Sequence, residues 1–340
     1  MTTRRGSSRS LLSTRAVRAD AALGTGGRAA LARLSPGGLA ARAGRRRFPM
    51  AAPSWPGGVP RPAPETDLGV EYDTAWSRRY PVRLARAMLL DNVTRPLAKV
   101  IASPLLRGTE ELEAIEAPVI FAANHASHID TPLLLSCLPL AFRHRTVVAA
   151  AADYFFDRRW KADFFAFSLN AIPIERNKVN RRSARLAAEL IEDGWSLIIF
   201  PEGGRSPDGW AQEFRGGAAY LSARTGRPVV PVHLDGTRHI LPKGGQGITR
   251  TRTTVTFGTP LWPEEGEHAR TLGARIETAV ATLADETSTD WWTARKRAVR
   301  GTTPPLQGPD LPAWRRSWAL PTTTADNAGD DAPDWPRTAR

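Results

Sequence analysis

The sequence predicts an α/β domain in which a mixed, mostly parallel sheet is flanked by helices. From residue 118 onward, short apolar runs alternate with helix-like segments, and this alternation is typical of layered α/β domains. The apolar runs at 118–123 and 196–200 lead into the polar motifs NHASHID and FPEGGRS. Open α/β sheets place their sites at the carboxyl ends of strands, so these motifs are the first candidates for a functional site.

Five runs of five or six residues are expected to form strands. Val, Ile, Phe or Thr recur in each of them, and polar or turn-forming residues bound them. In chain order they are 118–123, 146–151, 196–200, 229–234 and 253–257. A further short run at 171–174 leads into Glu175 and Arg176.

Four segments between or after these strands are expected to be helical, namely 131–138, 181–193, 218–225 and 271–287. The first follows Asp130-Thr-Pro, and an aspartate cap with proline in the first turn favours a helix start. Gly194 comes directly after the second helix, where a left-handed cap residue is expected because glycine has no Cβ.

An amphipathic segment at 82–105 precedes these elements. Apolar residues recur there at three- and four-residue steps, with arginine and lysine at other positions around the helix. Pro96 is expected to break the helix into two pieces, because proline removes a backbone donor and clashes with the preceding turn. A helix packed on the core and an interfacial helix against anionic lipid both fit this pattern, and the two roles can occupy different faces.

The formal net charge of +13 is concentrated in the first 64 residues. They contain twelve arginines and one acid, whereas the remaining 276 residues carry 35 basic and 33 acidic side chains. A nucleic-acid partner is therefore not expected. With scattered apolar residues, the segment 1–64 is expected to be disordered. Its Arg- and Ser-rich, acid-poor composition fits a targeting segment, and it equally fits a start site misassigned upstream of Met50.

Tryptophan beside arginine and lysine distinguishes the last part of the chain, at Trp291, Trp292, Trp314 and Trp318. This composition fits a membrane-interface anchor, and an arm folded back over the core fits it as well. Beyond about residue 300 the sequence turns to Pro, Thr, Asp and Gly, so order is expected to fade there. We therefore expect a tail at 1–64, a central domain at 65–290 and a Trp/Arg-rich arm at 291–340.

The motif NHASHID, residues 124–130, places His125 five positions ahead of Asp130. A histidine titrates near physiological pH, and a carboxylate that binds its second ring nitrogen fixes the tautomer. We therefore expect His125 to be a catalytic base and Asp130 to orient it. Cys137 is the only cysteine and lies outside the motifs, and no GxSxG motif supplies a serine nucleophile.

The motif FPEGGRS, residues 200–206, provides the groups of a pocket for a phosphate ester. Arg205 offers a bidentate fork and Ser206 a hydroxyl, while Gly203 and Gly204 let backbone N–H groups approach closely. Glu202 is expected at the same site, where it either orients Arg205 or holds the loop.

Both motifs, in this order and at this separation, resemble those of the glycerophospholipid acyltransferase family. Two further blocks match in family order, PIERN at 173–177 and PVVPVHLDG at 228–236. The resemblance covers roughly residues 80–260. It implies that Arg176 is a second cation for the substrate phosphate and that Pro231 shapes the acyl-donor side.

The resemblance also implies a reaction, in which an acyl group passes directly from a thioester to the free hydroxyl of a lysophospholipid. The expected acceptor is 1-acyl-sn-glycerol 3-phosphate, which would become phosphatidic acid, and the donor is acyl-CoA or acyl carrier protein. The family usually has threonine where this chain has Gly204, which leaves glycerol 3-phosphate or another lysolipid as alternative acceptors. No window holds the roughly 18 apolar residues of a spanning helix, so we expect peripheral contact with the cytoplasmic face of a membrane.

One alternative from a different class is a metal-dependent hydrolase. His125, His128 and Asp130 lie within six residues, but they do not match the His-x-His-x-Asp-His pattern of metallo-β-lactamases. No second Cys/His cluster supplies further ligands. We therefore expect neither a metal nor a cofactor, and we expect His128 to be a loop residue near the pocket.

Overall fold

The computed structural model describes residues 68–176, 181–241, 247–316 and 319–320. All of them belong to the second of the two units into which the chain divides, residues 67–340. The tail predicted at 1–64 lies outside the described residues. The arm predicted at 291–340 shares its unit with the central domain.

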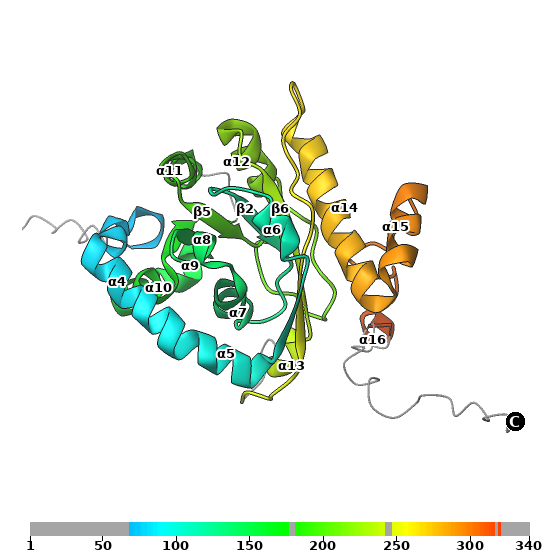
Figure 1. Ribbon diagram of the computed structural model, residues 1–340, viewed down its shortest axis with the longest axis horizontal. Helices are drawn as coiled ribbons and strands as arrows, with labels where there is room; N and C mark the ends of the chain where they lie inside the picture. Colours follow the sequence, from blue (N-terminus) through cyan, green and yellow to red (C-terminus); the bar gives the residue numbers. More distant parts are fainter. Residues whose placement is uncertain (1–67, 177–180, 242–246, 317–318, 321–340) are drawn as a thin grey trace, which may run out of the picture. The chain divides into compact units, whose positions relative to one another are not determined.

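In the described part of the chain, seven strands form one sheet in the order β1-β7-β6-β2-β5-β3-β4 (Figure 1). The strands are β1 (Pro104–Arg107), β2 (Ile120–Ala123), β3 (Thr146–Ala151), β4 (Ala171–Ile174), β5 (Ser196–Ile199), β6 (Val229–Asp235) and β7 (Thr253–Phe257). The five strands from β6 to β4 are mutually parallel, whereas β7 is antiparallel to β6 and parallel to β1. The prediction of a mixed, mostly parallel sheet is confirmed.

The helices of the described residues are α4 (Tyr80–Leu89), α5 (Arg95–Ala102), α6 (Glu110–Glu113), α7 (Asp130–Cys137), α8 (Leu140–Arg143), α9 (Ala152–Phe155), α10 (Arg159–Leu169), α11 (Arg181–Glu192), α12 (Gly217–Thr225), α13 (Thr237–Ile240), α14 (Ala269–Ser288), α15 (Trp291–Arg300) and α16 (Ala313–Arg316). Short 3-10 helices, η1 (Gly69–Glu71) and η2 (Ala75–Arg78), precede α4. The strands and helices predicted from residue 118 to residue 290 are all present within two residues of their expected bounds. Gly194 has the expected left-handed φ of 85°.

Strand β2 is buried on both faces of the sheet. Phe121 belongs to the apolar cluster that α5 and α7 cover, while Ile120 belongs to the cluster under α11, α12 and α14. Figure 1 shows α5 and α7 on one side of the sheet and α14 on the other. Burial on both faces explains the unbroken apolar run at 118–123. The loop after β2 therefore leaves from the centre of the core.

The prediction that Pro96 breaks the amphipathic helix is wrong. The chain is helical from Tyr80 to Ala102, and a π-helical turn, η3 (Leu90–Thr94), joins α4 to α5. Pro96 lies in the first turn of α5, where the wider turn before it leaves room for a residue without an N–H. The helix ends earlier than predicted, at Ser103, whose φ is 37°. Pro104 follows and begins β1, because a residue before proline is disfavoured in a helix.

Order beyond residue 300 persists further than predicted. After α15 the chain turns back onto α14, and Leu306 is buried with Val280 and Ala281. Gln307 donates a hydrogen bond from its side chain to Glu277 of α14 at 2.5 Å. An arm folded back over the core is therefore present through α16, while Trp318 lies outside the described residues. In the described part of the chain, no helix is both long enough and apolar enough to cross a membrane.

Candidate active site

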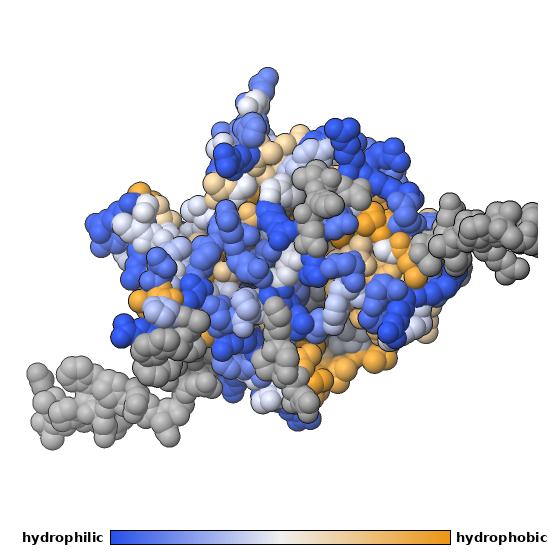
Figure 2. Space-filling view, turned by 180° about the vertical axis from the view of Figure 1, so that it is seen from behind, coloured by the Kyte–Doolittle hydropathy of each residue, from blue (hydrophilic) through white to orange (hydrophobic). Residues whose placement is uncertain are grey.

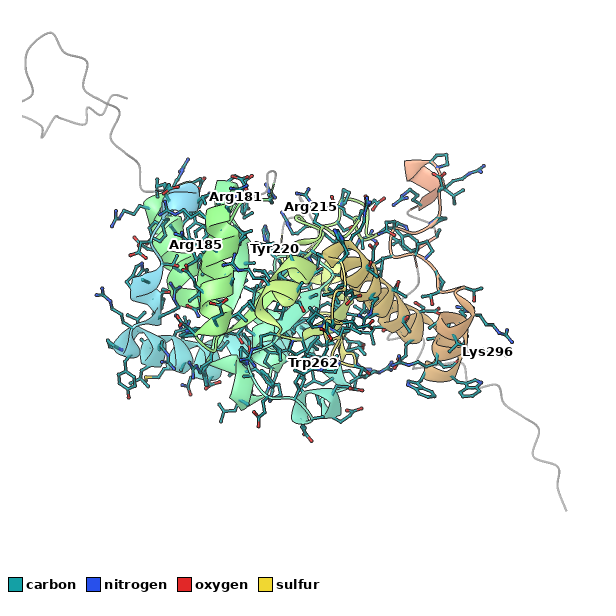
Figure 3. All side chains as sticks on the ribbon, turned by 90° about the horizontal axis from the view of Figure 1, so that it is seen from above. Arg181, Arg185, Arg215, Tyr220, Trp262 and Lys296 are labelled. Carbon is teal, nitrogen blue, oxygen red and sulfur yellow. The ribbon has the colours of Figure 1, made fainter. Side chains whose placement is uncertain are left out.

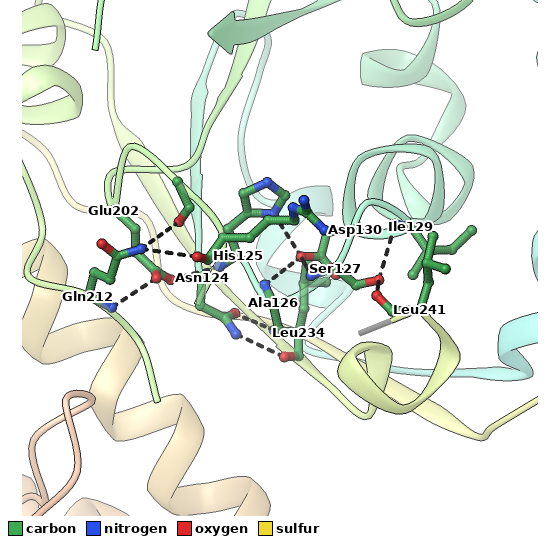
Figure 4. Close-up of polar contacts among 12 residues, drawn as sticks. Asn124, His125, Ala126, Ser127, Ile129, Asp130, Glu202, Gln212, Leu234 and Leu241 are labelled. Carbon is green, nitrogen blue, oxygen red and sulfur yellow. Dashed lines mark hydrogen bonds and ion pairs between the residues drawn. The ribbon is translucent and has the colours of Figure 1, made fainter. Parts of the chain in front are cut away.

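His125 and Asp130 form a hydrogen-bonded pair at the end of β2. His125 is the second residue after the strand, and Asp130 is the first residue of α7. The Nδ1 atom of His125 lies 2.8 Å from Oδ2 of Asp130 (Figure 4). The predicted spacing of five residues thus places the two side chains in contact, because the loop turns back at the start of α7.

The Asp130 side chain is fully buried, and its position is fixed by the backbone. Its Oδ2 atom also accepts hydrogen bonds from the backbone N–H groups of Ala126 at 2.7 Å and Ser127 at 2.8 Å. With the carboxylate held in this way, Nδ1 of His125 donates to it and Nε2 is left to accept a proton. The imidazole also stacks on Phe200, with ring centroids 4.2 Å apart.

Glu202 connects the loop after β2 to the loop after β5, which we call the glycine loop (residues 200–212). One carboxylate oxygen accepts from the backbone N–H of His125 at 2.7 Å, and the other accepts from that of Gln212 at 2.9 Å (Figure 4). Burial raises the pKa of Glu202 to about 7. Of the two roles expected for Glu202, holding the loop is the one that these hydrogen bonds describe, and neither of them involves Arg205.

The glycine loop presents unpaired donors at Gly204 and Arg205. Among the described residues, neither backbone N–H of this pair has a hydrogen-bond partner, and the Arg205 guanidinium has no hydrogen bond or ion pair. Gly203 and Ser206 instead shape the loop. Gly203 has a φ of 71° and donates to the carbonyl of Phe200, while the Ser206 hydroxyl accepts from Gly209 N–H at 2.7 Å.

Ser206 also ties the glycine loop to the histidine, because its backbone N–H donates to the His125 carbonyl at 2.8 Å. The loop after β4 places Arg176 beside the same loop. Its guanidinium forms an ion pair with Asp153 at 2.6 Å and approaches the Gly203 carbonyl at 3.5 Å. The structure therefore brings the candidate base and the predicted phosphate-binding residues to one edge of the sheet.

Two residues of this site are absent from the sequence prediction. The Gln212 side chain donates to the carbonyls of Gly204 at 3.1 Å and Arg205 at 3.2 Å. Arg215 donates to the carbonyl of Arg176 and lies against Gly203, where an added Cβ would be 2.9 Å from its Nε atom. Both come after FPEGGRS in an irregular stretch, and the only signal for Arg215 is that it is a basic residue two positions before the first residue of α12.

Pro231 and His128 lie at the margin of the site. Pro231 is buried in β6 opposite Ala122, and its ring packs against Gly258. Its assignment to the acyl-donor side stays a prediction. The His128 ring stacks on Tyr154 with centroids 5.8 Å apart, and burial, together with the nearby charge of Arg205, lowers its pKa to about 4. His128 is therefore neutral at physiological pH.

The described residues contain no group of three or more His, Cys, Asp or Glu side chains that could hold a metal ion. His125 and Asp130 bind each other, and His128 faces Tyr154. The metal-dependent hydrolase alternative gains no support from this arrangement.

A family model described as acyltransferase matches residues 104–235, a segment that holds the His125–Asp130 pair and the glycine loop. Residues 104–235 are therefore similar to the acyltransferase family. A chloroplastic 1-acyl-sn-glycerol-3-phosphate acyltransferase of Brassica napus is 32% identical over 42% of this chain and 40% of its own length. A lyso-ornithine lipid O-acyltransferase of Pseudomonas aeruginosa is 31% identical over 38% of this chain and 48% of its own length.

The chain thus spans less than half of the length of these two curated relatives. Among solved structures, the 1-acyl-sn-glycerophosphate acyltransferase of Thermotoga maritima aligns with a TM-score of 0.49 at 25% identity. That alignment covers 63% of this chain and 86% of the other.

In the segment that matches the acyltransferase model, replacing His125 with alanine should lower the turnover number by about 10²–10⁴-fold, the usual contribution of a general base. Asp130→Asn should also lower turnover, because the amide cannot hold the same tautomer. Turnover and thermal unfolding would be measured on both variants. His239→Ala, at an exposed histidine outside the NHASHID and FPEGGRS motifs, is the matched control. Near-normal turnover of His125→Ala with an intact fold would exclude this residue as the base.

Glu202→Gln should change how the stability of the folded chain depends on pH. Because burial raises the pKa of Glu202 from 4.5 to about 7, the folded chain binds its proton more tightly than the unfolded chain does. This contribution to stability is complete below pH 4.5 and is lost as the pH rises through 7. Glutamine does not titrate, so the free energy of unfolding of the wild type should fall relative to the variant by about 3 kcal/mol across this window.

Urea unfolding of both proteins at pH 5 and pH 8 measures this difference. A stability difference that stays constant between the two pH values would show that Glu202 is ionised throughout.

Proposed function

We propose that this protein transfers a fatty acyl group from an acyl thioester to the free hydroxyl of a lysophospholipid. The preferred acceptor is 1-acyl-sn-glycerol 3-phosphate, which becomes phosphatidic acid, and the donor is acyl-CoA or acyl carrier protein. The observation that carries the proposal is the His125–Asp130 pair, joined through Ser206 to a loop with unpaired donors at Gly204 and Arg205. A base beside an anion-binding loop fits an acceptor that carries both a hydroxyl and a phosphate.

In the proposed reaction, the acceptor hydroxyl gives its proton to Nε2 of His125 while its oxygen attacks the thioester carbonyl carbon. A C–O bond forms, and the C–S bond breaks as the tetrahedral intermediate collapses. The His125 imidazolium, stabilised by Asp130, returns the proton to the leaving thiolate. The products are an ester and a free thiol, so atoms and charge balance without a covalent enzyme intermediate.

Cys137 does not supply a nucleophile to this scheme. It lies at the last residue of α7, and Asp130 is the first residue of the same helix. The thiol is buried, and burial raises its pKa to about 12. It therefore stays protonated, whereas a nucleophilic cysteine must be a thiolate.

Arg205 is the cation best placed to bind the acceptor phosphate. Arg176 is neutralised by Asp153, and Arg215 donates to the Arg176 carbonyl, whereas Arg205 has no such partner in the described part of the chain. A guanidinium binds phosphate with two parallel hydrogen bonds, and adjacent backbone N–H groups add further donors. The lyso-ornithine lipid relative keeps open an acceptor other than lysophosphatidate.

A membrane surface is the proposed location of both substrates, and the α4–α5 helix supports peripheral contact with it. Six large apolar side chains on this helix are each more than half exposed, namely Tyr80, Leu84, Met88, Val93, Leu97 and Val100. They follow one another at steps of four residues, apart from one step of five at the π-helical turn, which keeps Val93 in line with Met88, and a last step of three from Leu97 to Val100. Figure 2 shows hydrophobic surface along the lower edge of the molecule, where Figure 1 places α5.

Helix α15 supports a second contact with anionic lipid. Trp291 and Trp292 are 57% and 68% exposed, and the Arg295 guanidinium lies over the Trp291 ring. Lys296 extends outward from the same helix (Figure 3). Exposed tryptophan with basic neighbours suits the boundary between lipid tails and head groups.

Acceptor assays with labelled acyl-CoA test the proposed function. The Arg205→Ala variant tests whether Arg205 binds the acceptor phosphate. The variant should raise the KM for lysophosphatidate by about 10- to 100-fold, since a charge-assisted hydrogen bond contributes about 1.5–3 kcal/mol. The KM for acyl-CoA should not change. Arg185→Ala, at an exposed position on α11 (Figure 3), is the matched control.

The panel should also contain glycerol 3-phosphate, lysophosphatidylcholine and lyso-ornithine lipid. Acylation of the last alone would reassign the acceptor, and an equal rise of both KM values in Arg205→Ala would indicate a collapsed loop. Hydrolysis of acyl-CoA without ester formation would contradict the proposal.

Placing charges among the exposed apolar side chains of the α4–α5 helix should weaken membrane binding. The double variant Val93→Glu/Leu97→Glu should lower the partition onto vesicles with anionic lipid by at least about tenfold, because burying one such side chain contributes about 1.5–3 kcal/mol. Trp262→Glu is the control, since Trp262 is 53% exposed but precedes Glu264 and Glu265. Vesicle sedimentation measures the partition, and equal binding of all three proteins would contradict this role of the helix.

A further inference from the structure

The second half of the glycine loop lies beneath a segment near the end of the described chain, residues 306–316, which we call the strap. Three hydrogen bonds join the two segments. Ala211 N–H donates to the Leu306 carbonyl at 3.1 Å, and the Trp210 indole N–H donates to the Arg316 carbonyl at 2.9 Å. The Arg316 guanidinium completes the set with an ion pair to Asp208 at 2.8 Å.

Close packing adds to these hydrogen bonds. Gly308 lies so near the Trp210 ring that an added Cβ would be 2.2 Å from it, and its φ of 71° suits glycine. Leu306 is buried with Ala211 and Phe214 on one side and with α14 on the other. The strap backbone at Gly308 therefore packs directly against the indole ring of Trp210.

The strap is itself held in place. Gln307 donates to Glu277 of α14, and the Arg316 guanidinium donates to the carbonyls of Gln307 at 2.9 Å and Pro309 at 3.2 Å. Arg316 thus bonds both to its own segment and to Asp208. One side chain connects the packed strap to the glycine loop.

The residues that contact the strap are next in the chain to Gln212, which bonds to the loop that carries the donors of the candidate site. Gln212 follows Ala211, and its side chain and backbone N–H bond to Gly204, Arg205 and Glu202. Glu202 in turn accepts from the backbone of His125. A shift of residues 208–211 would therefore displace Gly204 and Arg205 directly through Gln212. It would displace His125 only indirectly, through Glu202.

We propose that the strap is a positioning element of the acceptor site, with Trp210 and Arg316 as its positioning residues. The inference rests on the proposed function for its substrate, but its structural part concerns the glycine loop alone. The strap lies outside the segment that matches the acyltransferase family, residues 104–235. By holding Gln212, it sets where Gly204 and Arg205 present their donors to the acceptor phosphate.

Two glycine variants test this inference at equal backbone strain. Gly308→Ala forces a Cβ into the Trp210 ring, whereas Gly301→Ala has a similar φ of 66° and no atom within 4 Å of the new Cβ. Gly308→Ala should raise the KM for lysophosphatidate by about 10- to 100-fold, the scale expected when binding groups are misplaced by about 1 Å. Gly301→Ala should not change it, and the KM for the acyl thioester should not change in either variant.

Arg316→Ala should act like Gly308→Ala. Arg316→Lys should restore part of the affinity, because it keeps a charge for Asp208 but loses the fork to Pro309 and Gln307. Equal rises in both KM values, or a lower thermal midpoint with unchanged KM values, would overturn the proposal, since either marks a purely structural role.

Hydrogen exchange gives a readout that does not need activity. The amides of residues 202–212 should exchange faster in Gly308→Ala than in Gly301→Ala, while those of α7 should not differ. If the wild type acylates no acceptor, the proposed function fails, and this comparison still decides whether the strap controls the loop. Unchanged exchange at 202–206 would overturn the inference even in an active enzyme.

Discussion

The Glu202 carboxylate is 1% exposed and accepts hydrogen bonds from the backbone of His125 and of Gln212. A buried carboxylate is costly unless donors already point at it, so this contact forms only when both loops hold one arrangement. The pairing of Ile120 in β2 with Leu197 in β5 provides that condition, because adjacent parallel strands release their loops side by side. The geometry of base and donors therefore follows from the pairing of two strands 77 residues apart.

Short-range patterns in the sequence predict the parts of this site that depend on neighbours along the chain. The His125–Asp130 contact needs only a strand, a five-residue step and a helix start, and all three are visible in residues 118–131. Gln212 contributes through hydrogen bonds to Gly204 and Arg205, eight and seven residues earlier in the chain. Arg215 contributes through a hydrogen bond to Arg176, 39 residues earlier, and no periodicity marks either residue. The role of Glu202 stayed open for the same reason, since its partners come from two loops.

The same distinction holds for the fold. Strand β1 was not predicted, because its pairing partner is β7, about 150 residues later, and most of its side chains are exposed. The helical path through Pro96 depends on a single wider turn, which the three- and four-residue spacing of the apolar residues does not predict. That turn also matters for the surface. By adding one residue, it keeps the exposed apolar side chains of α4 and α5 on one stripe, as the proposed lipid contact would require.

Gly203 and Gly204 are adjacent in the glycine loop but are subject to different steric constraints. At Gly203 the left-handed φ and the nearby Arg215 exclude a side chain. At Gly204 an added Cβ would meet only Arg176 and Gln212 at 3.8 Å, an ordinary contact. Sterics therefore do not explain why this chain lacks the hydroxyl that its family usually carries there. With one donor fewer, the proposed recognition of the acceptor head group would depend more heavily on Arg205 and on the two amides that have no partner among the described residues, so the segments that position them would have a larger share in selecting the substrate.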